Sequence, residues 1–533
     1  MTRLGILFCG FALIVGCSDS DPPGAVGGET SAGSSGDTNA SGPTDPGSGS
    51  EATSSGGGDV PSAESGSTAG DDGSTGDVGE DPPSCEDGPA PEVCGNGIDE
   101  DCDGEDWACP EAAVHVDNVS GDDGADGSAE NPVASVARGL ELAESGTVIF
   151  LQATELGYTG ACITEPGISL VGWGGQPVID QRVECDGRAA LIFSRADDFR
   201  IENVRLDASA LGGLRLRALI FSGLPDAPIY RNEARFVDAL GPGVGPDGRS
   251  LISASLCYDC LLEYSSSIES EDHGIYWTNH QDGSVIRGNY VARADGACLQ
   301  LNADPETNDP MHPFQDGIMS DGLVEDNVLE DCGNESGGAA LNLAGVHDTV
   351  FRNNLMFGSP FNGGVAMWDD GYSDWGEAGD FDFGCVGNEF VHNTIDCRGC
   401  DRHAFSLRNG STSNIVRNNI FITAEFDAVA VDSESNSGND VDYNVYLEGT
   451  IFEGVDGQWV GIEAWRVSTG HDLNSLSVAL GTLFVDEADG DYRLAPNSPA
   501  IDAGSGTSVP FDYDDVPRPQ GTAPDPGAFE FVP

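Results

Sequence analysis

Four side chains in this sequence could carry acid–base chemistry on a bound molecule. They are His273, Arg408, Asp369 and Asp370, with His280 and Tyr276 close to the first of them in sequence. A positioned imidazole or carboxylate can take or give a proton near neutral pH. A single histidine in a loop is more often structural, and two acids adjacent in sequence seldom face one bond. The set is therefore an incomplete catalytic apparatus.

A second group of side chains has the chemistry to bind sugars. Amide and hydroxyl groups hydrogen-bond sugar hydroxyls, and aromatic rings stack on pyranose faces. The candidate ligand-binding residues are Tyr276, Gln300, Asn302, Asn342, Trp368, Tyr372 and Trp375. A sheet face that only contacts solvent would also be polar, so the alternative interpretation is a surface with no ligand.

A third group could hold a hard cation. Asp99, Asp101 and Asp103 alternate and are followed by Gly104, which matches the start of a D-x-D-x-D-G loop, and Asn96 could add an oxygen. Alternate carboxylates with a permissive glycine can wrap one calcium-like ion. The twelfth loop position is a proline instead of the glutamate of an EF-hand. The alternative is an acidic knot, closed by disulfides, with no specific ion.

An asparagine repeat indicates which elements position these groups. One phrase recurs: an apolar residue, two variable residues, Asn, one residue, and a second apolar residue. Its asparagines are Asn289, Asn327, Asn354, Asn393, Asn419 and Asn444. They are 38, 27, 39, 26 and 25 residues apart. A period in the twenties with β-rich content predicts a solenoid of stacked parallel coils, with these asparagines in one ladder at a corner. Asn suits such a corner because it tolerates the left-handed backbone. Asn232 also fits the phrase, and Ser265 takes the place of an Asn.

The same phase brings a second strand of each coil into register. Its inward residues are expected to be Ile275, Leu299, Leu341, Val365 and Phe405, then Trp277, Leu301, Leu343, Met367 and Leu407. Alternation then turns Tyr276, Gln300, Asn342, Ala366 and Ser406 outward, followed by Thr278, Asn302, Ala344, Trp368 and Arg408. Two long excursions, 303–317 and 368–383, follow this strand and should leave one edge of the solenoid about 10 Å apart. They would wall a groove around the outward residues.

The N-terminal sequence predicts that the protein is exported and that a tether follows the signal. Residues 1–17 contain one arginine and a short apolar run, and they end in Cys17; they resemble a bacterial lipoprotein signal in which that cysteine is lipidated. An ordinary secretory peptide is the alternative. Residues 18–83 are rich in Gly, Ser, Thr, Asp and Pro, so we expect a disordered acidic stalk.

Charge and cysteine content narrow the classes of partner. The formal net charge is −69, and every basic residue is arginine. Such a surface repels nucleic acid and anionic membranes, and it repels polyanionic sugars unless a divalent cation bridges them.

Fifteen cysteines in an exported chain imply disulfides. Cys162 with Cys185 and Cys298 with Cys332 are each one coil apart, and the two CxxC pairs, at 257–260 and 397–400, favour structural disulfides. An odd number implies one thiol outside such pairs.

Three segments resemble known bacterial surface proteins. Residues 121–149, with Gly121-Asp122-Asp123-Gly124 and a helix capped by Ser135, resemble the opening of exported right-handed parallel β-helix proteins of the pectate-lyase-like class. Residues 491–506 and 525–531 resemble the closing segment of many bacterial surface β-helices. Residues 94–106 resemble a cysteine-framed metal-binding motif. These resemblances imply an all-β right-handed parallel β-helix with a short N-terminal capping helix, and calcium as a possible ligand. We also expect a monomer.

The expected organisation follows from these segments. It is a signal peptide with lipobox at 1–17, the stalk at 18–83, the metal-binding motif at 84–110, the β-helix at 111–490 and the closing segment at 491–533. We expect the protein in the cell envelope, where it is lipid-anchored at the outer membrane and exposed on the cell surface. Two functions fit: binding of extracellular or cell-wall polysaccharide in the groove, or a polysaccharide-active enzyme, a calcium-assisted lyase or epimerase. The resemblance implies an Arg or Lys base for such lyases, and the absence of lysine excludes the lysine-dependent branches.

Overall fold

A computed structural model describes the chain from residue 88 to its last residue with short gaps. The segments outside it are 1–87, 95–97, 103–106, 111, 212–215, 243–249, 279–281, 304–316, 334–337, 360–362, 369–383, 425 and 507–508. The described residues belong to one compact unit, Gly79–Pro533. None of the described helices is long and apolar enough to cross a membrane. The predicted signal, Cys17 and stalk lie outside the described residues.

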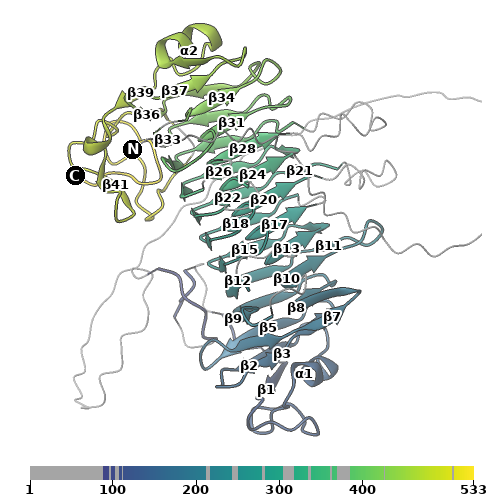
Figure 1. The fold of residues 1–533 in the computed structure, drawn as a ribbon. Helices are drawn as coiled ribbons and strands as arrows, with labels where there is room; N and C mark the ends of the chain where they lie inside the picture. The colour runs from purple at the N-terminus through teal and green to yellow at the C-terminus, as the bar shows by residue number, and fades with distance from the viewer. Residues whose placement is uncertain are drawn as a thin grey trace, which may run out of the picture. The chain divides into compact units, whose positions relative to one another are not determined.

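The described chain is a right-handed parallel β-helix, as predicted (Figure 1). Its coils are built on two large sheets of short strands, because each coil adds a strand to the same rows as the coil before it. The 13-stranded sheet consists of β4 (Ala161–Ile163), β7 (Val183–Cys185), β8 (Arg188–Ser194), β10 (Arg217–Ser222), β13 (Ile252–Ser255), β17 (Ile275–Thr278), β20 (Leu299–Asn302), β24 (Leu341–Ala344), β28 (Val365–Trp368), β31 (Phe405–Leu407), β34 (Val429–Val431), β37 (Ile451–Glu453) and β38 (Trp459–Gly461).

The second sheet has 22 described strands in two rows. They are β1 (Ala113–Val116), β2 (Val148–Gln152), β3 (Tyr158–Thr159), β5 (Ser169–Trp173), β6 (Val178–Gln181), β9 (Arg200–Asp207), β12 (Glu233–Leu240), β15 (Leu261–Glu263), β16 (Ser266–Ile268), β18 (Val285–Arg287), β19 (Tyr290–Ala292), β22 (Leu323–Glu325), β23 (Val328–Glu330), β26 (Val350–Arg352), β27 (Leu355–Phe357), β29 (Glu389–Val391), β30 (Thr394–Cys397), β32 (Ile415–Arg417), β33 (Ile420–Thr423), β35 (Asp440–Asp442), β36 (Val445–Leu447) and β39 (Leu476–Val478). Three small pairs complete the strands: β11 (Ile229–Tyr230) with β14 (Cys257–Tyr258), β21 (Met319–Ser320) with β25 (Val346–His347), and β40 (Phe484–Asp486) with β41 (Asp491–Leu494).

The predicted asparagine ladder is confirmed. Each side-chain amide donates to the Oδ1 of the next ladder asparagine at 2.9–3.1 Å, from Asn289 to Asn444. Ser265 extends the ladder, since its backbone N–H donates to Oδ1 of Asn289 at 3.0 Å. The predicted reason was wrong in one detail. The left-handed residue is the one before each ladder asparagine, for example Asn353 (φ 54°) and His392 (φ 58°). The asparagine itself is held by its hydrogen bonds.

A second ladder, which the repeat phrase did not predict, lies one corner earlier in each coil. Asn388 donates to Asn414 at 3.0 Å, and Asn414 donates to Asn439 at 3.1 Å. Asn232 occupies this corner, directly before β12, so its assignment to the first ladder was wrong. Buried amides that bond up and down the stack fix these two corners of the coil, because an unpaired buried amide is costly.

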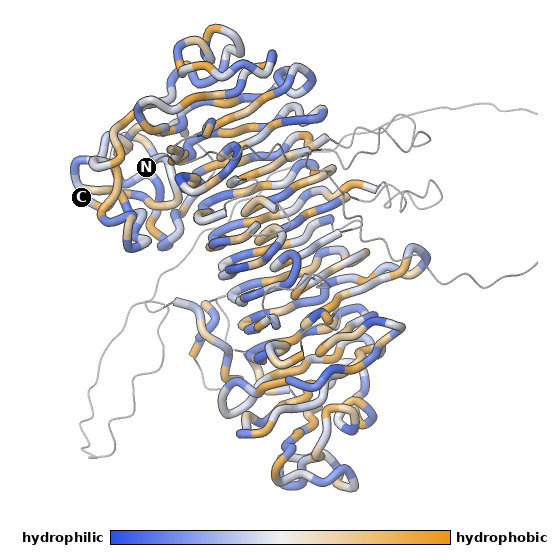
Figure 2. The backbone as a smooth tube through the Cα atoms, viewed as in Figure 1, coloured by the Kyte–Doolittle hydropathy of each residue, from blue (hydrophilic) through white to orange (hydrophobic). Residues whose placement is uncertain are grey.

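The interior is filled by the alternate residues that the phase predicted. Ile275, Trp277, Leu299, Leu341, Val365 and Phe405 are all fully buried. Aromatic rings stack from coil to coil, with the centroids of Phe351 and Phe390 4.5 Å apart. Figure 2 shows apolar and polar stretches alternating along the coils. The burial pattern of β17 and β28, alternately buried and partly exposed, is that of a strand with one face in a core.

Both ends of the stack are covered. At the first coil the helix α1 (Val136–Leu142) is capped by Ser135, whose hydroxyl accepts the N–H of Arg138 at 3.1 Å, as predicted. At the last coil the helix α2 (Ile462–Thr469) buries Trp465 against Phe452, with ring centroids 5.1 Å apart. A short 3-10 helix, η4 (Leu480–Thr482), follows. Such lids satisfy the exposed ends of a solenoid.

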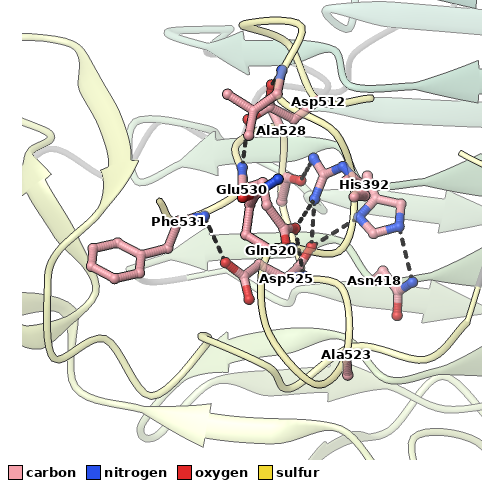
Figure 3. Close-up of polar contacts among 12 residues, drawn as sticks. His392, Asn418, Asp512, Gln520, Ala523, Asp525, Ala528, Glu530 and Phe531 are labelled. Atoms are coloured by element: carbon pink, nitrogen blue, oxygen red, sulfur yellow. Dashed lines mark hydrogen bonds and ion pairs between the residues drawn. The ribbon is translucent and has the colours of Figure 1, made fainter. Parts of the chain in front are cut away.

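The closing segment packs against the side of the stack. Phe484, Tyr492 and Phe529 share an apolar cluster with Ile420 and Val445 of the coils. Figure 3 shows the polar part of this contact: the Nδ1–H of His392 donates to the carbonyl oxygen of Asp525 at 2.9 Å, and Asn418 donates to Nε2 at 3.1 Å. The antiparallel pair β40–β41 spans the predicted boundary at 490/491.

The predicted disulfides within the β-helix are confirmed. Cys162–Cys185 and Cys298–Cys332 join neighbouring coils, and both CxxC pairs, Cys257–Cys260 and Cys397–Cys400, are closed. Within the described residues the free thiol is Cys385, which is buried, and burial raises its pKa to about 11. A thiol that stays protonated in an apolar interior is inert, so we assign it no chemistry.

Candidate functional site

The five predicted ligand-binding residues that the structure describes come together on the outer face of the 13-stranded sheet. Tyr276, Gln300 and Asn342 are register neighbours on β17, β20 and β24. Asn302 and Trp368 occupy the second outward row on β20 and β28. We call Tyr276, Gln300, Asn302, Asn342, Ala366 and Trp368 the amide face. Parallel stacking in phase puts these side chains in adjacent coils although they span more than ninety residues of sequence.

A directional chain of hydrogen bonds connects the amide face. The indole Nε1–H of Trp368 donates to Oδ1 of Asn342 at 3.0 Å, and Nδ2 of Asn342 donates to Oε1 of Gln300 at 2.5 Å. Nε2 of Gln300 then donates to Oδ1 of Asn302 at 3.3 Å. These bonds fix which end of each amide is the donor, so the polar groups are oriented before any ligand arrives.

The members of the amide face differ in exposure. Gln300 is only 4% exposed, and Ala344 and Ser406, which also point outward, are 1% and 6% exposed. Outward direction therefore does not guarantee solvent access here. Tyr276, Asn302, Asn342 and Trp368 remain partly exposed. The covered Gln300 orients Asn302 and Asn342. A ligand can reach the partly exposed groups, which are Tyr276, Asn302, Asn342 and Trp368.

His273 lies at one end of the amide face, in the corner that precedes β17. Its Nδ1 accepts the backbone N–H of Ala297 at 2.9 Å, so the proton sits on Nε2, 3.6 Å from Oδ1 of Asp272. Its ring centroid is 5.3 Å from that of Tyr276. The next coil thus holds the imidazole in one tautomer. In return, the ring accepts a backbone hydrogen bond of that coil, so His273 has a structural role as well as a polar edge.

Arg408 belongs to a different cluster, at the other end of the face. Its Nη2 lies 3.0 Å from Oε2 of Glu453 and 3.1 Å from Nε2 of His403. Nδ1 of His403 lies 2.5 Å from Oδ2 of the buried Asp427. Because a carboxylate only accepts, the proton is on Nδ1, and the Nε2 lone pair faces Arg408. We call His403, Arg408, Asp427 and Glu453 the histidine cluster.

The two ends are too far apart to act on one bond. His273 and His403 occupy the same corner position, two residues before β17 and β31, and four coil steps separate them. At about 4.8 Å per step this is about 19 Å. His273 and Arg408 are therefore not brought together, and Arg408 is engaged with a carboxylate. Asp369, Asp370, Tyr372, Trp375 and His280 lie outside the described residues.

The sequence prediction missed His403, Asp427 and Glu453. They are 24 and 26 residues apart, which is one coil each time. Phase was the signal that could have found them, because Glu453 is in register with Ala430, which is itself in register with Ser406. The strands that precede the two predicted walls end where expected, β20 at Asn302 and β28 at Trp368, with β24 between them. The wall segments 304–316 and 369–383 lie outside the described residues.

The predicted cation loop is described in part. Asp99, Asp101 and Glu92 lie with carboxylate oxygens within 4.8 Å of one another, whereas Asn96 and Asp103 lie outside the described residues. Glu92 accepts the backbone N–H groups of Glu100, Asp101 and Trp107, and Asp101 pairs with Arg235 at 3.1 Å. The Cys94–Cys109 disulfide closes this segment. Its oxygens suit calcium, and Glu92 is a ligand candidate that the sequence pattern did not include.

On the 22-stranded sheet, arginines and glutamates form a column of ion pairs along the stack of coils. Six register neighbours alternate in sign: Glu202, Arg235, Glu263, Arg287, Glu325 and Arg352. Arg287 lies 2.6 Å from Glu325 and Arg235 lies 3.1 Å from Glu263. Burial raises the pKa of Glu263, and the two neighbouring arginines oppose that rise. These guanidinium groups serve the fold and do not face the amide face.

Comparison with known proteins shows similarity to solved β-helix structures at low identity. No protein-family model matches the chain, and no curated protein does. The structure of pectate lyase Pel9A has a TM-score of 0.47 and 14% identity, covering 79% of this chain and 97% of that one. XylC in complex with xylose has a TM-score of 0.43 and 9% identity, covering 79% and 98%. The GH136 lacto-N-biosidase from Eubacterium ramulus has a TM-score of 0.41 and 11% identity, covering 69% and 68%. These values say nothing about the ligand of this chain.

Proposed function

We propose that this protein is a cell-surface lipoprotein that binds extracellular or cell-wall polysaccharide on its amide face. The observation that carries the proposal is the hydrogen-bonded series from Trp368 through Asn342 and Gln300 to Asn302. Oriented amides beside a partly exposed indole match the alternation of hydroxyls and apolar ring faces in a sugar chain. A stalk anchored at Cys17 would hold this face away from the membrane.

A second candidate is a polysaccharide-active enzyme, which the histidine cluster favours. The buried carboxylate of Asp427 fixes His403 with its Nε2 lone pair outward, beside a guanidinium and a second carboxylate. An imidazole of fixed tautomer can act as a general base once the Arg408 guanidinium, which donates to Nε2 here, turns toward a bound substrate. His403 replaces His273 as the residue to test, because Arg408 is its neighbour.

One experiment separates the two functions. The mature full-length protein is applied to a glycan array with calcium, and bound glycans are then tested by absorbance for unsaturated uronate products and by reducing-end release. Binding that is lost in Trp368→Ala, with no product from the wild type, supports a binding protein. Turnover that survives Trp368→Ala and is abolished in His403→Ala would establish the enzyme instead.

Anchoring is tested independently of the ligand. Cys17→Ala is expressed in the native cell and compared with the wild type by membrane fractionation and by labelling of intact cells. The proposal expects the wild type in the outer-membrane fraction and accessible from outside, and the variant in the soluble fraction. Unchanged membrane association of the variant would refute lipid anchoring at this cysteine.

A further inference from the structure

We infer that the ligand of the amide face is a neutral glycan, without carboxylate or sulfate groups, that lies parallel to the axis of the coils. The inference rests on the proposed binding function and adds the substrate class and the direction of the chain. Three observations carry it: the absence of charge on the face, the engagement of Arg408 at its end, and the acidity of the segments that follow its strands in the sequence.

The amide face is uncharged over several coils. Its rows run through Tyr276, Gln300, Asn342, Ala366 and Ser406, and through Thr278, Asn302, Ala344 and Trp368. None of these side chains ionises near neutral pH, and the described part of both rows contains no arginine between β17 and β28. Recognition of a carboxylate or sulfate normally uses a guanidinium or an ammonium group. A face built from amides, a phenol and an indole offers none.

Arg408, which follows β31 at one end of the face, is already paired. The guanidinium of Arg408 is in contact with Glu453 at 3.0 Å, and it also donates to Nε2 of His403, whose Nδ1–H donates to Asp427. Asp427 and Glu453 together balance more than the single charge of Arg408. A uronate placed here would meet carboxylates before it met a free positive charge.

The sequence of the adjoining segments points the same way. Residues 304–316, which follow β20, contain four acidic residues and no arginine, and residues 369–383, which follow β28, contain six acidic residues and no arginine. The chain has no lysine, so no other strong base is available in either segment. A polyanion that approached this edge would be repelled at long range, since like charges raise the free energy of association.

The direction of the ligand follows from the register. Hydrogen-bonding groups recur once per coil along the axis, from Trp368 on β28 to Asn342 on β24 and Asn302 on β20. That interval is about 4.8 Å, close to the length of one pyranose ring, so consecutive sugars can address consecutive coils. Across the strands the face is only four residues wide, which is the length of β20 or β24. A chain that follows the axis therefore meets more of the polar groups than one that crosses it.

The test uses the full-length protein and defined oligosaccharides. Calorimetry measures binding of cellohexaose, xylohexaose, mannohexaose and hexagalacturonate in EDTA, which removes bridging cations, at about 50 mM and about 500 mM NaCl. The expected result is binding of at least one neutral hexamer, unchanged by salt, with hexagalacturonate at least about tenfold weaker. Asn342→Ala should weaken the neutral ligand at least about tenfold, while Asn474→Ala, which removes an exposed amide elsewhere, should not.

The possible failures are distinct. Hexagalacturonate that binds in EDTA as tightly as any neutral hexamer, and loses affinity in Asn342→Ala, overturns the neutral-glycan inference and leaves the proposed function standing. Affinity for a neutral trimer equal to that for the hexamer would contradict a chain that follows the axis over successive coils. If no hexamer binds and a wide array of glycans is also negative, the proposed function itself is wrong.

Discussion

The Nδ1 atom of His403 lies 2.5 Å from Oδ2 of Asp427, one coil further on. Asp427 has a side chain only 1% exposed, so its carboxylate is hydrogen-bonded to this imidazole instead of to bulk water. The pair fixes the tautomer of His403 and, through Nε2, the place of Arg408. A single inter-coil contact thus organises the charged end of the sheet.

Removal of this carboxylate should destabilise the protein measurably. Asp427→Ala leaves the Nδ1–H of His403, whose side chain is 17% exposed, without its acceptor, and the loss of a mostly buried hydrogen bond costs about 1–3 kcal/mol. The free energy of unfolding in urea should fall by that amount. Glu434→Ala, an exposed acid in the next turn, is the control and should change it by less than about 0.5 kcal/mol. Equal stabilities of the two variants would contradict a structural role for the His403–Asp427 contact.

Substitution of an asparagine in the middle of the ladder should strongly reduce the stability of the protein. Asn354 is fully buried, donates to Asn393 and to the carbonyl of Val324, and accepts from Asn327. Asn354→Ala therefore orphans groups in both neighbouring coils, and we expect a loss of at least about 3 kcal/mol. Differential scanning calorimetry measures it, with Asn474→Ala as the matched amide deletion. A loss no larger than that of the control would show that the ladder does not stabilise the coils.

The contact of the closing segment should depend on pH through His392. Its imidazole is fully buried, and burial, together with nearby Arg518, holds its pKa well below the usual value of 6.5. The unfolded chain binds a proton at this site that the folded chain does not, so stability is lost as pH falls below about 6.5. His392→Asn does not titrate and tolerates the left-handed backbone found there (φ 58°).

The measurement is the difference in unfolding free energy between wild type and His392→Asn at several pH values between about 8 and about 5. The wild type should lose its advantage progressively on acidification. Carboxylates such as Asp525, whose pKa burial raises to about 6, are present in both proteins and cancel in the difference. A difference that does not vary with pH would mean that His392 is not the titrating group.

Calcium should stabilise the segment around Asp99 if the cation hypothesis is correct. A ligand that binds only the folded state raises its stability by RT ln(1 + [L]/Kd), so millimolar calcium over a submillimolar site should add about 1–3 kcal/mol. Asp99→Asn keeps the size of the side chain and should abolish most of that gain. The full chain is used, and magnesium is the comparison ion. No gain for the wild type with calcium would favour an acidic knot closed by its disulfide.

The sequence by itself determined the β-helix, the first asparagine ladder and the outward row of amides. All three depend on phase alone: coils that repeat in register place equal positions side by side, so spacing predicts neighbours. The same spacing contained His403, Asp427 and Glu453, but only tertiary packing shows that Arg408 turns back onto them. Packing also decided that Gln300 is covered although it points outward, and that the left-handed residue precedes the ladder asparagine.

The position of the closing segment was decided by the tertiary structure alone. Its contacts, such as Asn418 with Ser505 at 2.9 Å and Asn353 with Phe511 at 3.0 Å, join residues 87 and 158 positions apart. No period relates these residues, because the segment is not a coil. Its apolar side chains could be buried on any apolar strip of the stack. The segment lies on the strip where its polar groups also find hydrogen-bond partners, and these partners are in position only when all the coils are folded.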